Sequence, residues 1–234
     1  MVDSVAFLCA MPMELRPLTR RLGLRRAEIG GVEVRTGRLG DRDVVAMVMG
    51  MGPELAGKAT ARLLDTVTPV RVVVVGITGA VEDETPIGTV IVPEVVVDGA
   101  TGREHRPHGL GSRTPSGAMW TTSAITPPGE LAALRARGVV ALDMETSAVA
   151  ACCERRGIPW SVFRAISDRA TDGTVDEEVF ALSHQDGSPN GSAVLRYLLR
   201  HPMRVPRLVS LATGAKRATE RAAAAAVEAV LAAG

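Results

Sequence analysis

Two stretches of the chain place carboxylates directly after apolar segments. The apolar residues 139–142 lead to Asp143-Met144-Glu145, and the mostly apolar residues 160–166 lead to Ser167-Asp168. Open α/β sheets build their sites where the strands end. Two carboxylates at neighbouring strand ends therefore predict a pocket in which one acid holds a sugar and the other moves a proton.

Asp168 is the candidate proton donor. It follows a strand with a buried pattern, so its carboxyl group is expected at the mouth of a partly dry pocket. Burial raises the pKa of a carboxyl group, and a protonated Asp can donate to a leaving group at neutral pH. The alternative is an Asp that caps the next turn, which a Ser-Asp sequence favours.

Glu145 and Met144 are the candidate sugar-binding residues. A carboxylate can accept both hydrogen bonds of a vicinal diol, and the neighbouring Met offers an apolar surface to the face of a ribose. The alternatives are a Glu placed at a helix N-terminus, where the helix dipole favours negative charge, and a Met that fills the core.

Glu14 and Arg164 form a second candidate pair. Glu14 follows the first strand at the start of a helix, where a helix-terminal charge is the alternative explanation. Arg164 lies inside an otherwise apolar strand, and a buried Arg needs an anionic or carbonyl partner. Glu14 or an anion of the substrate would supply it.

The composition indicates one soluble, reduced, cytoplasmic domain. The chain has 234 residues, 46% hydrophobic and 3% aromatic, and a formal net charge of +1, which provides no global field to attract nucleic acid. Cys9, Cys152 and Cys153 have no metal-binding spacing. The sequence shows neither the pattern of a secretory signal nor an apolar run of membrane-spanning length, and no metal or cofactor is implied.

The hydrophobic pattern predicts an α/β fold: a single domain with a central twisted mixed sheet flanked by helices, plus a C-terminal helical extension. A small-residue loop is expected over 76–80 and an irregular segment over 98–128. Residues 139–166 are expected to form a βαβ unit. The expected strands are 5–10, 32–39, 43–49, 70–75, one or two within 86–97, 139–142 and 160–166, and the expected helices begin at 12, 53 and 144.

These motifs together resemble a known family. The residues are Ala10-Met11-Pro12-Met13-Glu14, Gly76-Ile77-Thr78-Gly79-Ala80, Asp143-Met144-Glu145 and Arg164-Ala165-Ile166-Ser167-Asp168. In order and spacing they resemble the nucleoside phosphorylase and nucleosidase superfamily, most of all the methylthioadenosine/S-adenosylhomocysteine nucleosidases. The resemblance covers residues 4–182, and we therefore expect a catalytic domain over 1–182 and an extension over 183–234.

The resemblance implies a role for each matching residue. Asp168, supported by Ser167, would protonate N7 of a purine leaving group; Glu145 would hold the ribose hydroxyls above Met144; Glu14, helped by Arg164, would orient or deprotonate the attacking water. Such a division suits a bond that breaks through an oxocarbenium-like sugar. Substrate contacts are also expected at Thr78, Gly79, Ile125 and Thr126.

Two positions favour water over phosphate as the nucleophile. Phosphorolytic members of the superfamily carry phosphate-binding Arg and Ser residues where this chain has Val74 and Ile77. Phosphorolysis stays open as an alternative because other residues could contact an anion. These are Arg164, Thr78, Arg103, His105 and Arg106.

The extension predicts a basic amphipathic segment. Between Leu195 and Arg221 its cations are Arg196, Arg200, Arg204, Arg207, Lys216, Arg217 and Arg221, against Glu220, and its apolar residues are Leu198, Leu199, Val205, Leu208, Val209 and Leu211. Such a segment can lie on a membrane surface or dock on a partner; the alternative is a solvated helix packed on its own domain. It also resembles phosphorylase-like proteins of hopanoid biosynthesis, which implies an adenosyl-lipid substrate.

The function predicted from the sequence is cleavage of the N-glycosidic bond of a purine nucleoside, adenine in type, with a 5′-substituent. The resemblance implies a homodimer or other homo-oligomer, and the small net charge indicates no nucleic-acid partner. Adenosyl-lipid or nucleoside phosphorolysis is the main alternative. A nucleoside- or lipid-binding protein without catalysis is the alternative of another class.

Overall fold

The computed structural model describes residues 4–170 and 204–233, together with residues 178, 184, 190, 192, 196, 197, 200 and 201. The predicted boundary between residues 182 and 183 and the apolar residues Leu195, Leu198 and Leu199 lie outside the described residues. The strands are β1 Ser4–Cys9, β2 Arg25–Ile29, β3 Val32–Leu39, β4 Arg42–Val48, β5 Arg71–Ala80, β6 Val90–Ile91, β7 Val95–Asp98, β8 Glu104–His105, β9 Ala118–Thr121, β10 Val139–Asp143 and β11 Trp160–Arg169. The helices are α1 Pro12–Leu22, α2 Pro53–Thr66, α3 Pro128–Ala136, α4 Thr146–Arg155 and α7 Val205–Ala232.

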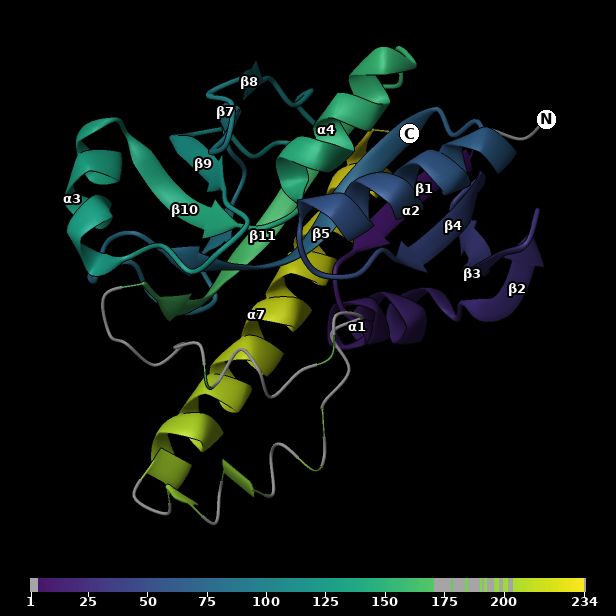
Figure 1. Cartoon of the computed structure of the whole chain (residues 1–234). Helices are drawn as coiled ribbons and strands as arrows, with labels where there is room; N and C mark the ends of the chain where they lie inside the picture. The colour runs from purple at the N-terminus through teal and green to yellow at the C-terminus, as the bar shows by residue number, and fades with distance from the viewer. Residues whose placement is uncertain are drawn as a thin grey trace.

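The strands form one mixed sheet, as predicted, in the order β2-β3-β4-β1-β5-β10-β9-β7-β8, with β11 paired to β5 and β6 (Figure 1). The pairs β1 with β4, β1 with β5, and β5 with β11 are parallel. The outer strands β2 and β3 and the pair β7 and β8 are antiparallel. The predicted α/β domain with a central mixed sheet is confirmed.

Strand β5 is the branch point of the sheet. Its first half pairs with β1, its last two residues pair with β10, and its other edge pairs with β11 over most of its length. The small-residue loop predicted over 76–80 is wrong, because these residues continue β5 to Ala80. Small side chains there allow polar groups of neighbouring elements to approach the strand closely.

The predicted βαβ unit over 139–166 is also wrong. β10 and β11 are not neighbours, since β5 lies between them, and β10 pairs with β5 antiparallel whereas β11 pairs with it parallel. The carboxylates at 145 and 168 therefore lie on opposite sides of β5 rather than on adjacent strands. The helix between them begins at Thr146, two residues later than expected, and leaves Met144 and Glu145 in the connection.

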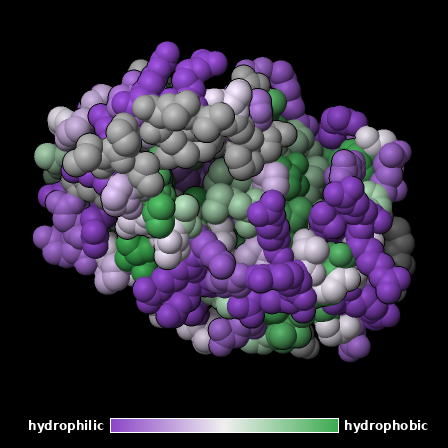
Figure 2. All heavy atoms as spheres, turned by 90° about the horizontal axis from the view of Figure 1, so that it is seen from below, coloured by the Kyte–Doolittle hydropathy of each residue, from purple (hydrophilic) through white to green (hydrophobic). Residues whose placement is uncertain are grey.

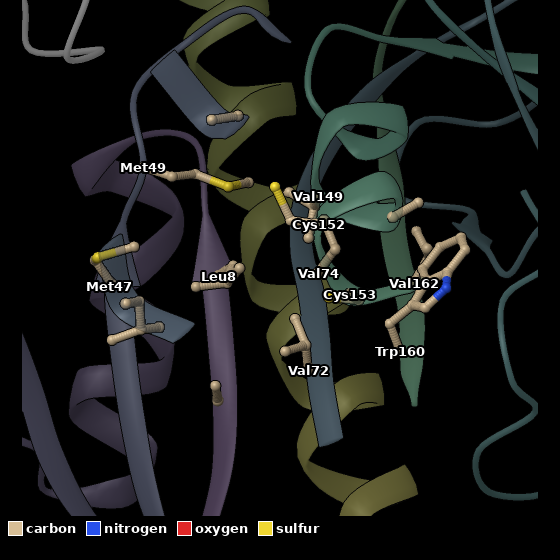
Figure 3. Close-up of a cluster of buried hydrophobic side chains, with 14 of the residues drawn as sticks. Leu8, Met47, Met49, Val72, Val74, Val149, Cys152, Cys153, Trp160 and Val162 are labelled. Carbon is tan, nitrogen blue, oxygen red and sulfur yellow. The ribbon is translucent and has the colours of Figure 1, made fainter. Parts of the chain in front are cut away.

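Two apolar layers cover the sheet. On β1, Ala6 and Leu8 face the layer that contains α2 and α4, whereas Val5, Phe7 and Cys9 face the layer that contains α1 and α7. This alternation follows from the two-residue period of a strand. Figure 3 shows the first layer, in which side chains of β1, β4 and β5 meet those of α4 and the start of β11.

Helix α7 covers the second face of the sheet. Its second half contributes mainly alanines to the buried layer, from Ala218 to Ala229, and small side chains let the helix approach the strands closely. Arg42 fixes its end by donating to the carbonyls of Val230 and Ala233, at 3.4 and 3.0 Å. The first turns project below the sheet (Figure 1) and include Val209, which is 59% exposed.

Four elements escaped the sequence prediction. β2 precedes the predicted meander, β8 and β9 lie inside the segment expected to be irregular, and α3 follows it. β9 is important for the site because it pairs in parallel with β10 and aligns Thr121 with Asp143. In the part of the chain that the structure describes, no helix combines the length and apolarity that crossing a membrane requires.

Candidate active site

A pocket of about 130 Å³ opens at the ends of β5, β10 and β11. It brings together five of the ten residues proposed from the sequence: Gly79, Ile125, Thr126, Met144 and Asp168. Its other lining residues are Thr122, Ala124, Leu142, Asp143, Arg169 and Ala170.

Gly79 lies between the two strands that carry the acids of the pocket, β10 and β11. In the sheet it pairs with Leu142 of β10 on one side and with Asp168 of β11 on the other. A Cβ at Gly79 would lie 3.4 Å from Asp168 Oδ2, an ordinary contact distance. The strand β5 thus sets the separation between Asp168 and the 143–145 segment.

Asp168 lies at the end of β11, half-buried, where a register irregularity follows Ile166. The hydroxyl of Ser167 lies 2.5 Å from Asp168 Oδ1 and 3.4 Å from the carbonyl oxygen of Thr78. Thr78 in turn donates its hydroxyl to the carbonyl of Leu142 at 2.5 Å. Ser167 and Thr78 therefore do not line the pocket but tie its walls together.

A buried cluster of one Arg and three carboxylates lies behind the pocket. Arg164 Nη2 is 2.8 Å from both Asp143 Oδ2 and Glu145 Oε2, and Nη1 is 3.7 Å from Glu14 Oε1. Arg164 therefore has the anionic partner expected of a buried guanidinium, but Asp143 and Glu145 are closer than the predicted Glu14. All four side chains are almost completely buried.

Asp143 joins this cluster to the pocket, and sequence reasoning gave it no role. Its Oδ1 accepts a hydrogen bond from Thr121 at 2.7 Å, and its Oδ2 accepts one from the backbone N–H of Thr146 at 2.9 Å. The Thr146 hydroxyl also donates to Oδ2. Asp143 thus accepts hydrogen bonds from donors at the N-terminus of α4 while it binds Arg164. The sequence signal that could have identified it is an Asp at the end of an apolar strand.

Glu145 lies between α2 and Arg164. Its Oε1 accepts from the backbone N–H of Gly52 at 3.0 Å, and its Oε2 accepts from Arg164. Glu145 is not among the residues that line the pocket. Because Gly52 and Arg164 already donate to its carboxylate, a ribose diol would have to donate to the remaining lone pairs.

Glu14 is held by the backbone of two elements. Its Oε2 accepts from Met11 N at 2.9 Å, which closes the N-terminus of α1, and its Oε1 accepts from Ile77 N at 2.8 Å. A Cβ at Gly76 would lie 2.3 Å from Glu14 Oε1, so only glycine leaves space for this carboxylate. Glu14 therefore serves as a helix-terminal charge and also belongs to the buried cluster.

The cluster changes the protonation of its own acids. Burial raises the pKa of Glu145 to about 7, although Arg164 opposes the shift, and burial likewise raises the pKa of Glu14. Burial disfavours the charge on Arg164, but Asp143, Glu145 and Glu14 outweigh it and raise the pKa of the guanidinium. Near neutral pH Glu145 is consequently protonated in a fraction of the molecules.

Three of the basic residues that kept phosphorolysis open are bound away from the pocket. Arg103 and His105 both contact Glu154, at 3.1 and 2.9 Å, and Arg106 contacts Glu104 at 3.2 Å. None of these three residues is among those that line the pocket. Val74, one of the two positions that favour water, lies fully buried in the core layer of α2 and α4.

Arg169 is the one cation among the residues that line the pocket, and it was not proposed from the sequence. It follows Asp168 directly at the end of β11, which was the available signal. Its Nε is buried without a hydrogen-bond partner in the described structure. The pocket therefore combines the carboxylates of Asp143 and Asp168 with a guanidinium, threonine hydroxyls and the apolar residues Leu142 and Met144.

Sequence relatives point to one family of enzymes. The chain is 24% identical to the 5′-methylthioadenosine/S-adenosylhomocysteine nucleosidase of Tolumonas auensis over 231 residues, which cover 84% of this chain and 99% of the relative. It is 26% identical to the protein of the same name from Shewanella sp. W3-18-1, over 63% of this chain and 78% of the relative.

Solved structures share the fold. The 5′-methylthioadenosine/S-adenosylhomocysteine nucleosidase of S. pneumoniae, bound to a transition-state inhibitor, superposes with a TM-score of 0.75 at 17% identity and covers 99% of this chain and 100% of its own. Futalosine hydrolase of Helicobacter pylori superposes with a TM-score of 0.72 at 14% identity, covering 96% and 95%. The sequence pattern of the Phosphorylase superfamily matches residues 4–117 and 104–200. The chain therefore belongs to the Phosphorylase superfamily.

Proposed function

We propose that this protein hydrolyses the N-glycosidic bond of a purine nucleoside, adenine in type, that carries a 5′-substituent. The observation that carries the proposal is that Asp168 and Met144 line one pocket, which Asp143 joins to the Arg164 cluster. The nucleosidases among the relatives support the reaction class.

In the proposed reaction, Asp168 gives a proton to N7 of the purine as the C–N bond breaks and the bond electrons pass to the base. The sugar becomes an oxocarbenium-like cation, and water then bonds to the anomeric carbon and gives its proton to the carboxylate of Glu14. Ser167 orients Asp168, to which it is hydrogen-bonded. Ile125 and Thr126 line the same pocket as Asp168 and are proposed to contact the base.

The buried cluster is proposed to bind the sugar and the water. Glu145 accepts the ribose hydroxyls with the lone pairs that Gly52 and Arg164 leave available. Glu14 orients the water, and the raised pKa values of both acids allow a proton to be exchanged within the cluster. Thr78 and Gly79 shape the strand beneath the sugar, and Arg169 contacts an acceptor of the substrate.

Water is the proposed nucleophile because Val74 and Ile77 offer no side chain that binds phosphate. Arg169 keeps phosphorolysis as the second candidate, since it places a cation in the pocket. We also propose that the 5′-substituent can be a lipid, and that the protein is a homodimer in the cytoplasm. Nucleoside binding without catalysis is the alternative of another class.

The test is release of free base, measured by chromatography. Methylthioadenosine, S-adenosylhomocysteine, inosine, futalosine and an adenosyl-lipid are each incubated with the protein, with and without phosphate. We expect adenine release from one or more 5′-substituted adenosines at a rate that phosphate does not change. Saturable binding without release from any of them would contradict the enzyme, and a phosphate requirement would make it a phosphorylase.

The Asp168→Asn variant is the control for mechanism. Loss of the general acid should lower kcat for adenine nucleosides by about 10²-fold or more. A riboside with a leaving group that needs no protonation, such as 4-nitrophenyl riboside, should lose much less. Equal loss with both substrates would show that Asp168 acts by some route other than proton donation.

A further inference from the structure

A continuous basic surface runs along the junction of α1 and α7, on the face opposite to α2 and α4. Two grooves of about 420 Å³ each follow this junction and share Lys216 and Glu220 among their lining residues. We name it the α1/α7 basic surface. Its cations are Arg16, Arg20, Arg21, Arg35, Lys216, Arg217 and Arg221.

The positive charge of this surface is local and weakly compensated. The whole chain has a net charge of only +1, whereas Glu220 is the single acid among the residues that line the two grooves. Glu220 is itself bound by Arg20 and lies 3.5 Å from Arg21. The remaining cations therefore have no further acidic partner among the residues that line the grooves.

Apolar residues continue the surface along α7. The helix projects beyond the sheet at its first turns, where Val209 is 59% exposed and Leu208 and Leu211 are half-buried. Figure 2, which looks at the molecule from below, shows hydrophilic side chains interleaved with apolar ones on this side. Basic residues beside exposed aliphatic ones are the pattern of a helix that lies in a membrane interface.

We propose that the α1/α7 basic surface docks on a membrane of anionic phospholipids. Cations near such a surface each contribute to binding through its negative potential. The grooves have no aromatic side chain among their lining residues, whereas single-stranded nucleic acids bind on aromatic stacking platforms and protein interfaces are enriched in aromatic residues. The observations therefore favour lipid over the other polyanions.

The position of α7 links this surface to the candidate site. A Cβ at Gly214 would lie 2.9 Å from the carbonyl oxygen of Ser167, so the helix touches β11 next to Asp168. Lys216 and Arg217 follow two and three positions later in the same helix. A docked α7 would hold the pocket close to the bilayer, which is where a nucleoside with a lipid 5′-substituent would be presented. The docking itself does not depend on the proposed function.

The test is co-sedimentation of the full chain with vesicles of phosphatidylcholine alone or with added phosphatidylglycerol. We expect binding only to the anionic vesicles, lost between about 0.1 and 1 M salt as screening increases. The variant Lys216→Glu/Arg217→Glu/Arg221→Glu should lower the partition coefficient at least about tenfold.

A matched variant reverses three exposed cations elsewhere: Lys58→Glu, Arg106→Glu and Arg155→Glu. It should bind like the unmodified protein. Because the triple change in α7 could impair folding, Arg16→Glu/Arg21→Glu on α1 provides a second test, and thermal unfolding checks both. Failure to bind anionic vesicles, equal losses in the matched variant, or retention by heparin without vesicle binding would each overturn the proposal, whether or not the protein cleaves nucleosides.

Discussion

Arg164 and Asp143 form a buried ion pair with a separation of 2.8 Å between Nη2 and Oδ2. Asp143 also accepts hydrogen bonds from Thr121 and from the first turn of α4, so this one carboxylate fixes the guanidinium, β9 and the helix together. Asp143 lines the pocket, and Arg164 contacts the other two acids of the cluster, Glu145 and Glu14. Loss of the ion pair should therefore change the positions of Glu145 and Glu14.

Replacing Asp143 with asparagine should remove the negative charge of this side chain while its size and shape stay nearly the same. The Asp143→Asn variant would leave Arg164 with two carboxylates but would lose the charge-assisted bonds, and we expect a loss of about 1–3 kcal/mol in the free energy of unfolding. Urea denaturation measures it. Thr121→Val removes one neutral donor to Asp143 and also the acceptor of the Ser147 N–H, and it should cost about 1–2 kcal/mol. A smaller loss for Asp143→Asn than for Thr121→Val would contradict the central place of Asp143.

The pKa of Glu145 predicts a pH dependence of stability. Its value of about 7 in the folded protein lies above the ordinary value of 4.5, so the folded state holds its proton over a range in which the unfolded state has lost it. The contribution is complete below about pH 4.5 and is lost as the pH rises to about 7. Urea unfolding of the unmodified protein and of Glu145→Gln, each at several pH values, measures the contribution of Glu145 to the free energy of unfolding.

In that comparison the free energy of unfolding of Glu145→Gln should fall less between pH 4.5 and pH 7 than that of the unmodified protein. The difference should be about 1–3 kcal/mol, since one pKa unit corresponds to about 1.36 kcal/mol. Parallel pH profiles for the two proteins would show that Glu145 titrates at its ordinary value.

Alanine substitutions at Gly76 and Gly79 compare two places where a carboxylate lies against β5. A Cβ at Gly76 would lie 2.3 Å from Glu14 Oε1, whereas one at Gly79 would lie 3.4 Å from Asp168 Oδ2. Gly76→Ala should displace Glu14 and reduce stability by about 1–3 kcal/mol as an overpacked site does. Gly79→Ala should change the free energy of unfolding by less than about 1 kcal/mol. Equal effects in urea denaturation would contradict this geometry.

Gly214 tests the contact between α7 and the end of β11. Alanine is normally the better helix former by about 1 kcal/mol, but here its Cβ would lie 2.9 Å from the carbonyl oxygen of Ser167. Gly214→Ala should therefore destabilise the protein and lower turnover through Ser167 and Asp168. Ser210→Ala, at an exposed position of the same helix, should be neutral or stabilising in thermal unfolding. A higher melting temperature for Gly214→Ala would contradict the close packing.

The sequence patterns predicted the fold class well because they report burial. Long apolar runs such as 70–75 gave strands, and Gly52-Pro53 marked the start of α2. Short elements were missed where local composition favours loops. β9 lies in a segment rich in Gly, Pro and Ser, and it becomes a strand because β7 and β10 pair with it on both sides.

Half of the residues proposed for the site line one pocket, but their arrangement was not predicted. Met144 and Asp168 were found because their motifs are local. The insertion of β5 between β10 and β11 depends on pairing between segments that lie far apart in the chain, which no local pattern encodes. For the same reason the partners of Arg164 were incompletely predicted, since Asp143 is 21 positions away in the chain.

Helix α7 has a consequence for how the chain is made. All strands of the 11-stranded sheet precede it, so they leave the ribosome while one face of the sheet still lacks the helix that covers it. At ordinary rates of translation this interval lasts on the order of seconds. During that time Phe7, Val73 and Phe163 are an apolar surface available to chaperones or to other nascent chains, and the yield of folded protein should depend on how well that surface is protected.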